Sequence, residues 1–237
     1  NSHQEYNDFK FHIPNEFELF KNLKKINLDD SFPHYNLSTL QNLTKLEYLK
    51  IVSRGESEYS SSSNLKSEVD KLKYIKKLKI TVVCSNIINQ QLFAPQTARE
   101  LEIEFLLEDG YWEALIPDSI NQLQNLKKLI ISAGGDPFCF MELHEEDESS
   151  PIMECQFKEF LKFPQSMNLL ELQELTLYAP LDMESLHSLS GLKNLKRLTM
   201  NWCSIDSVPK FIMNLHKLEY LSLSRNCFFE LPEFITE

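Results

Sequence analysis

Residues 195–217 read L-K-R-L-T-M-N-W-C-S-I-D-S-V-P-K-F-I-M-N-L-H-K, and residues 218–235 read L-E-Y-L-S-L-S-R-N-C-F-F-E-L-P-E-F-I. Both stretches carry apolar residues at their first, fourth and sixth positions, and both later contain an apolar residue followed by proline, two variable residues and isoleucine. The alternation around the fourth and sixth positions predicts a short strand with one buried face. Proline fixes φ and lacks an amide donor, so it predicts the first turn of a short helix behind that strand.

The same apolar pattern, Leu-x-x-Leu-x-Leu with Ile, Ala or Met as substitutes, occurs eight times along the chain. Its first positions are Leu23, Leu46, Ile75, Ala98, Leu126, Leu172, Leu195 and Leu218. The successive intervals are 23, 29, 23, 28, 46, 23 and 23 residues. The period is therefore 23 with two expansions, and the interval of 46 is long enough for either a degenerate extra repeat or a large insertion. In this register we expect Leu198 and Leu221 to be buried, and Thr199 and Ser222 to face outward.

Segments behind the strands follow two patterns. Pro14, Pro117 and Pro209 each lie nine residues before the first position of the next repeat, and Pro232 repeats the word near the end of the chain. Two units lack the proline and show apolar residues in steps of three, a spacing typical of short helices or 3₁₀ turns. These are Leu37, Leu40, Leu43 and Leu46, and then Leu186, Leu189, Leu192 and Leu195.

These residues resemble a leucine-rich repeat protein of the short, 23-residue Leu-Pro-x-x-Ile type, and the resemblance runs from about Ile13 to Ile235. It implies an α/β solenoid: a right-handed horseshoe with a concave parallel β-sheet and short helices or turns on the convex side. We expect one domain over residues 1–237 with about eight to nine repeats, insertions near 53–64, 106–114 and 136–151, and an origin as an excerpt of a longer protein.

One position departs from the family pattern. The family usually places Asn three residues after the last strand leucine, where its side chain bonds neighbouring backbone groups along a ladder. Here this position holds Ser31, Arg54, Val83, Leu106, Gly134, Pro180, Cys203 and Asn226. Only Asn226 is standard, and Ser31 and Cys203 are tolerable substitutes, so we expect the central turns to be looser or locally irregular.

Composition narrows the function classes. The net charge of −11 argues against broad binding to nucleic-acid phosphates, which needs clustered Lys and Arg. No apolar run approaches the ~18–20 residues of a membrane-spanning helix. Six of the acidic residues lie in 136–151, where a solvated loop, a calcium site and a contact with a basic partner are the alternatives.

Cysteine and histidine spacing gives no metal or disulfide pattern. The five cysteines are Cys84, Cys139, Cys155, Cys203 and Cys227, an odd number at wide spacings, which favours a reducing cytoplasm over a secreted framework. The glycosylation-type triplets at Asn36 and Asn42 point the other way. The chain holds five glycines and no nucleotide-binding or hydrolase motif, so we expect no cofactor, no metal and no enzymatic activity. His144 beside Glu145 and Glu146 is the one dense acid–base cluster, and it lies in the acidic loop.

The outward strand positions are the candidate binding surface, because large residues there do not serve the core. We expect a partner protein, and no nucleic acid, to bind this concave face; the oligomeric state stays open. The candidate residues are Phe105, Tyr178, Thr199, Asn201, Trp202, Ser224 and Arg225. Exposed aromatics favour contact sites, although two of the three aromatics could instead fold against neighbouring loops. The alternatives are regulatory or substrate-recognition repeats of a larger signalling protein or enzyme, and a surface adhesin.

Overall fold

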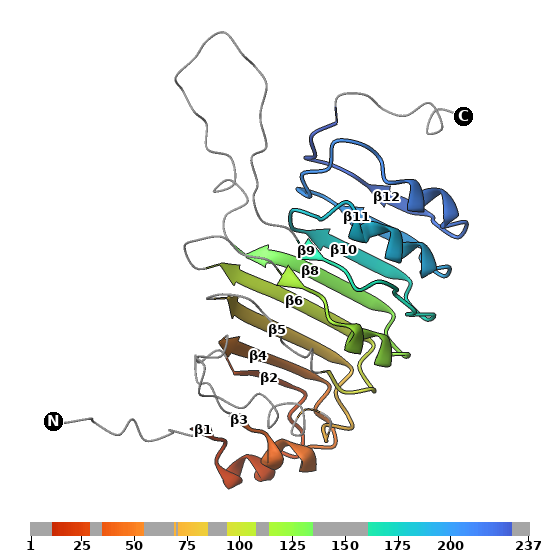
Figure 1. Ribbon diagram of the computed structural model, residues 1–237. Coiled ribbons are helices and arrows are strands. Elements are labelled where there is room, and N and C mark those ends of the chain that lie inside the picture. Colours follow the sequence, from red (N-terminus) through yellow and green to blue (C-terminus); the bar gives the residue numbers. More distant parts are fainter. Residues whose placement is uncertain are drawn as a thin grey trace, which may run out of the picture.

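The computed structural model describes residues 11–28, 35–54, 69, 71–84, 94–107, 114–134 and 161–228. Its main feature is an eight-stranded parallel sheet with the order β12-β11-β10-β8-β6-β5-β4-β2 (Figure 1). The strands are β2 (Lys25–Leu28), β4 (Tyr48–Arg54), β5 (Lys77–Cys84), β6 (Glu100–Leu107), β8 (Lys128–Gly134), β10 (Glu174–Tyr178), β11 (Arg197–Met200) and β12 (Tyr220–Ser222). Each strand begins two residues after the first position of one sequence repeat, so every repeat contributes one strand.

The register of the sheet follows the repeat. The leucines at the fourth position pair with one another from strand to strand: Leu78 with Leu101, Leu101 with Leu129, and Leu129 with Leu175. These leucines are fully buried, as is Leu198. A single apolar core therefore runs along the inner side of the sheet, and each repeat covers the face of its neighbour.

Five 3₁₀ helices lie behind the sheet among the described residues: η1 (Asn15–Leu19), η2 (Ser38–Asn42), η3 (Asp118–Gln122), η5 (Ser185–Gly191) and η6 (Lys210–Asn214). Pro14, Pro117 and Pro209 stand directly before η1, η3 and η6, and each carbonyl accepts a hydrogen bond from the amide three residues on. The two leucine series without proline form η2 and η5 and are buried. Both predictions for these segments are confirmed.

The long interval between the fifth and sixth repeats adds no strand to the sheet, because β8 pairs directly with β10. It holds an insertion, whose end forms β9 (Leu161–Lys162) beside β7 (Ala114–Leu115). Phe163-Pro164 follows β9 as a further apolar residue and proline, and this proline lies eight residues before Leu172 rather than nine. A similar short pair joins β1 (Phe11–His12) to β3 (Tyr35–Asn36).

Strand length varies with the asparagine position. The four strands β4, β5, β6 and β8 have seven or eight residues and include Arg54, Val83, Leu106 and Gly134, whereas β11 and β12 have four and three. At these four positions the chain is extended; the turns that follow lie outside the described residues, so their expected looseness stays a prediction. Most of the three predicted insertions, including His144, Glu145 and Glu146, lies outside the described residues.

Two expectations about burial are wrong. Leu221 pairs with Leu198 on the inner side but is 37% exposed, because β12 is the end strand of the sheet and has a neighbouring strand on one side only. Phe105 is 4% exposed and belongs to the core. Since β6 runs to Leu107, the alternation of sides continues beyond Glu104 and turns Phe105 inward beside Val82.

Candidate concave binding surface

We call the side of the sheet opposite the 3₁₀ helices the concave face. Two rows of outward side chains cross it in register, one residue per strand. The first row is Asn27, Lys50, Lys79, Glu102, Ile130, Thr176, Thr199 and Ser222, and the second is Val52, Thr81, Glu104, Ser132, Tyr178, Asn201 and Ser224. Because parallel strands lie ~4.7–4.9 Å apart, neighbours in a row can contact one another.

On the half of this face formed by β5 and β6, one lysine lies between two carboxylates, which leaves a net charge of −1. The Lys79 ammonium lies 2.8 Å from a Glu102 carboxylate oxygen and 3.0 Å from one of Glu104. Burial lowers the pKa of Lys79, but its hydrogen bonds to the two carboxylates outweigh that effect and leave the pKa raised above its usual value. The Thr81 hydroxyl donates to Glu104 at 3.1 Å. Thr81 and its neighbour Val52 are buried although they are on the outward side, so neither is available to a partner.

The half formed by β10, β11 and β12 is different in chemistry, since its two rows carry hydroxyl, amide and phenol groups and no charge. Tyr178 is 41% exposed. The Asn201 side-chain carbonyl accepts hydrogen bonds from the Ser222 hydroxyl at 2.8 Å and from the Ser224 amide at 2.9 Å. Thr199 stands next to Ser222 in the first row, half-buried.

Trp202 and Arg225 mark the point where the chain turns away from the sheet after β11 and β12. The two residues occupy equivalent positions 23 residues apart, and both have positive φ, 58° and 60°. The Arg225 guanidinium carbon lies 5.3 Å from the centre of the Trp202 ring, within the range of a cation–π contact. Left-handed backbone is rare for non-glycine residues, so the turn needs support from its surroundings.

Asn226 and Cys203 supply that support. The Asn226 carboxamide donates to the carbonyls of Met200 at 2.7 Å and Leu223 at 2.8 Å, and its oxygen accepts from the Cys203 amide at 2.9 Å. The buried Cys203 thiol lies 3.4 Å from the Leu177 carbonyl, and burial raises its pKa to about 12. The ladder expected from the resemblance is therefore present between the last two repeats, with Cys203 as its second member.

Of the seven candidate residues, the structure brings together five in the last two repeats: Thr199, Asn201, Trp202, Ser224 and Arg225. Tyr178 lies in the preceding repeat at the position equivalent to Asn201, one residue out of line with Trp202. Phe105 belongs to the core and leaves the set. Ser222 is added to the candidate residues, because its hydroxyl donates a hydrogen bond to Asn201. Its position, one repeat after Thr199, is the sequence signal that points to it.

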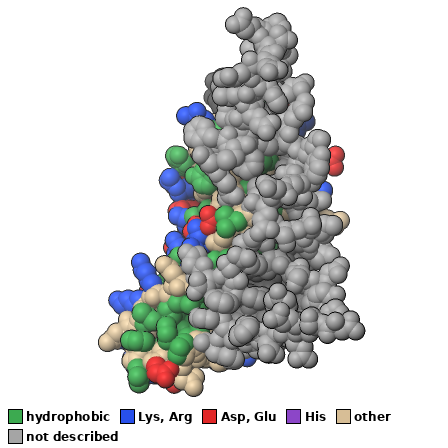
Figure 2. All heavy atoms as spheres, turned by 90° about the vertical axis from the view of Figure 1, so that its left-hand side faces the viewer, with side chains coloured by type: hydrophobic (Ala, Val, Ile, Leu, Met, Phe, Trp, Pro, Cys, Tyr) green, Lys and Arg blue, Asp and Glu red, His purple; other side chains and the backbone are tan. Residues whose placement is uncertain are grey.

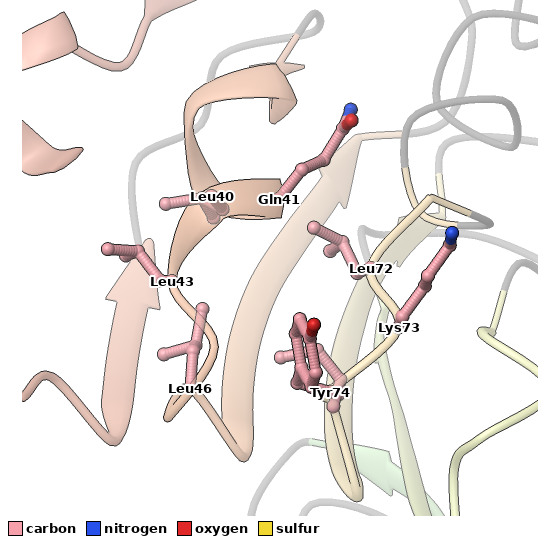
Figure 3. Close-up of a pocket in the computed structure, with 8 residues that line it drawn as sticks. Leu40, Gln41, Leu43, Leu46, Leu72, Lys73 and Tyr74 are labelled. Atoms are coloured by element: carbon pink, nitrogen blue, oxygen red, sulfur yellow. The ribbon is translucent and has the colours of Figure 1, made fainter. Parts of the chain in front are cut away.

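A small apolar groove lies elsewhere, between η2 and the turn before β5. Leu40, Leu43, Leu46, Leu72 and Tyr74 are among the residues that line it (Figure 3). The groove is shallow and encloses no space for even a water molecule, whereas typical small-molecule sites enclose ~300–1,000 Å³. The described residues contain no cluster of three or more His, Cys, Asp or Glu suited to a metal ion. Within the same residues, no helix has the length and apolar character to cross a membrane.

Comparison with known proteins gave structural likenesses only. No family model matches the chain, and no curated protein matches it. Among solved structures, a TDR receptor is similar with a TM-score of 0.46 and 20% sequence identity over 92% of this chain. A TLR13–ssRNA13 complex is similar with a TM-score of 0.40 and 18% sequence identity over 89% of this chain. A Leptospira interrogans leucine-rich repeat protein gives 0.29 and 16%, covering 96% of this chain and 80% of that one. The chain spans about a third, 33%, of the TDR receptor and TLR13 chains. With one parallel strand per repeat, a shared leucine core and 3₁₀ helices behind the sheet, the fold of this chain is the leucine-rich repeat solenoid.

Proposed function

We propose that this chain is a protein-interaction module that binds a partner protein through the concave face of β10, β11 and β12. The observation that carries the proposal is the Trp202–Arg225 contact, flanked by exposed Tyr178 on the same part of the molecule. Tyr, Trp and Arg are the residue types that most often dominate binding energy at interfaces. The Asn226 ladder holds the backbone beside both residues, and the two side chains already contact each other, which lowers the ordering cost of binding.

The surrounding polar groups suit recognition by hydrogen bonds. Thr199, Ser222 and Ser224 present small side chains around Asn201, and a partner's backbone or amide groups can replace water there at low cost in conformational entropy. The neighbouring charged half supplies only a weak field, because Lys79 offsets one of the two carboxylates beside it. We therefore expect binding here to depend weakly on salt.

We further propose a non-enzymatic role in the cytoplasm, and that the repeats are of the 23-residue type. The free thiol of Cys203 supports the location, since disulfides are uncommon in that compartment. The strand spacing of 23 residues between β10 and β11 and between β11 and β12 supports the repeat type. That the chain forms one domain is likewise a proposal, supported by the continuous core.

A photo-crosslinking pair tests the binding face. Tyr178→p-benzoylphenylalanine keeps an aromatic ring at an exposed concave position, and Asn214→p-benzoylphenylalanine places the same probe at an exposed position on η6. We expect the Tyr178 probe to crosslink one defined protein, and Trp202→Ala in the same chain to abolish that product. Crosslinks to the same protein from Asn214 alone would contradict the proposal.

A further inference from the structure

A second surface lies along the edge of the sheet where the strands begin. Each repeat enters its strand in the same way: a two-residue turn comes first, then two further residues, then the first residue of the strand. These segments are 21–25, 44–48, 73–77, 96–100, 124–128, 170–174, 193–197 and 216–220. Since the strands are parallel and in register, all eight segments lie along one lateral edge, at the right-hand ends of the strands in Figure 1. We call this edge the turn face.

The turn face has the opposite charge to the rest of the chain. Its eight segments contain 14 of the 24 Lys and Arg residues but only 5 of the 35 Asp and Glu residues, a net charge of +9. The remaining residues, with 10 basic and 30 acidic side chains, carry −20. Figure 2 views the opposite edge, and the Lys and Arg side chains visible there lie mostly along its left margin. The overall charge of −11 therefore conceals a strongly basic surface.

Ion pairs neutralise only part of this charge. Four of the five acidic residues on the turn face pair with a lysine on it: Glu47 with Lys76, Glu100 with Lys77 at 3.3 Å, Glu174 with Lys128 at 3.1 Å and Glu219 with Lys196 at 3.3 Å. The bond to Lys76 lowers the pKa of Glu47. The other ten cations of the turn face are exposed and have no ion pair within the described part of the chain, although Lys45 and Lys217 bond to asparagine side chains and Arg197 lies over the Tyr220 ring. The ten are Lys21, Lys24, Lys25, Lys45, Lys73, Arg99, Lys127, Lys193, Arg197 and Lys217.

Exposed apolar side chains lie within these segments or close to them in sequence. The six most exposed large apolar residues of the described chain are Leu19, Leu170, Met213, Phe20, Tyr74 and Tyr220, with exposures from 77% down to 43%. Leu170, Tyr74 and Tyr220 lie within the turn-face segments. Leu19 and Phe20 directly precede the first of them, and Met213 lies three residues before the last turn. Tyr74 also borders the apolar groove described above (Figure 3).

We propose that the turn face docks onto the surface of a membrane containing anionic lipids. Cations interspersed with protruding Leu, Phe and Tyr match the chemistry of a lipid surface, where Lys and Arg meet acidic headgroups and apolar side chains enter the acyl boundary. A nucleic acid would account for the cations and aromatics, but not for the exposed aliphatic residues Leu19, Leu170 and Met213. An acidic peptide would likewise leave those side chains in water.

The length of the turn face and the screening of charge by salt both suit docking on a membrane surface. Seven strand intervals of ~4.8 Å make the edge about 34 Å long, so many cations can approach a flat surface together. At physiological salt, charges more than about 8 Å from the membrane are largely screened, so the acidic remainder of the chain opposes docking weakly. Docked by this edge, the solenoid would stand on the membrane with its concave face open to the side. The lipid contact thus requires nothing of the proposed protein-binding function.

Vesicle sedimentation tests the proposal on the purified chain. Vesicles of phosphatidylcholine alone are compared with vesicles that also contain phosphatidylserine, at low and at high ionic strength. We expect binding only when phosphatidylserine is present, and weaker binding at high salt. Each lysine near an anionic surface contributes about a fivefold factor. Replacing Lys21, Lys24 and Lys25 by Gln should therefore weaken partitioning about a hundredfold.

Two matched variants separate charge from side-chain packing and from the apolar contribution. Arg at the same three positions keeps the charge and should retain binding, whereas Leu19→Ser should weaken binding severalfold without changing its salt dependence. Equal sedimentation with both vesicle types, or unchanged binding of the Gln variant with native circular dichroism, would overturn the proposal. Binding to single-stranded homopolymeric RNA or polyglutamate, but to neither vesicle type, would overturn it and assign the turn face to that other polyanion.

Discussion

The register of the solenoid predicts different costs for three truncations on neighbouring positions. Leu198 is fully buried on β11, in contact with repeats on both sides. Leu198→Ala removes three carbons at about 0.8 kcal/mol each, or about 2.4 kcal/mol of transfer free energy. The cavity left between two covering repeats raises the loss of unfolding free energy to about 3–4 kcal/mol. Leu221 is 37% exposed, so its truncation should cost only about 1.5 kcal/mol. Thr199→Ala, on the outward side, should cost less than about 0.5 kcal/mol.

Urea unfolding followed by circular dichroism measures these differences. Amide hydrogen exchange should accompany it, because a repeat protein can open from one end and the Leu221 change lies in the last described strand. Equal losses from Leu198→Ala and Thr199→Ala would refute the assignment of sides. A Leu221 loss as large as that of Leu198 would show that the end of the sheet is covered after all.

Three further predictions follow from individual contacts. Gly191→Ala should destabilise the chain by about 1–3 kcal/mol in the same urea assay, because a Cβ at this position would lie 2.5 Å from the Met167 carbonyl oxygen. Unchanged stability would mean that η5 can shift to make room for the methyl group. The Cys203 thiol, with its pKa raised to about 12 by burial, should react with a maleimide only after unfolding, and native labelling seen by peptide mass spectrometry would contradict its burial. Lys79→Met should destabilise the chain at neutral pH, because it leaves the Glu102 and Glu104 carboxylates without their cation. Since the pKa of Lys79 is raised in the folded chain, the stabilisation by its charge is present at neutral pH, and the loss should shrink as the pH rises through the Lys79 pKa; a loss independent of pH would show that packing, not charge, is responsible.

The sequence alone predicted the structural features that recur in every repeat. The start of each strand, the inward leucines and the 3₁₀ helices after Pro14, Pro117 and Pro209 are set within one 23-residue unit. Trp202 and Arg225 could be placed on neighbouring repeats by the same count, and the structure brings them into contact. Local patterns predict these features because each depends on the chain within one repeat and its nearest neighbours.

Features that depend on where a strand stops or on the position of a repeat in the array were not predictable in this way. Phe105 is turned inward by the continued extension of β6, and Leu221 is exposed by its place on the end strand. The basic turn face is hidden by the net charge, and it becomes evident only when the eight turns are aligned along one edge. The sequence words 22–26 and 125–129, each reading Asn-Leu-Lys-Lys followed by an aliphatic residue, carry that signal locally.

The most direct test of the proposed binding face is the affinity of a purified partner for Trp202→Ala, with Lys210→Ala as the matched control on η6. Trp202 is half-buried beside the Arg225 guanidinium, so its loss should remove the centre of the contact. We expect Trp202→Ala to weaken binding by about 2 kcal/mol, or about thirtyfold, with little change in thermal stability. Lys210→Ala should bind as the unmodified chain does. Full affinity in Trp202→Ala together with weakened binding in Lys210→Ala would contradict the account and move the site to the convex side.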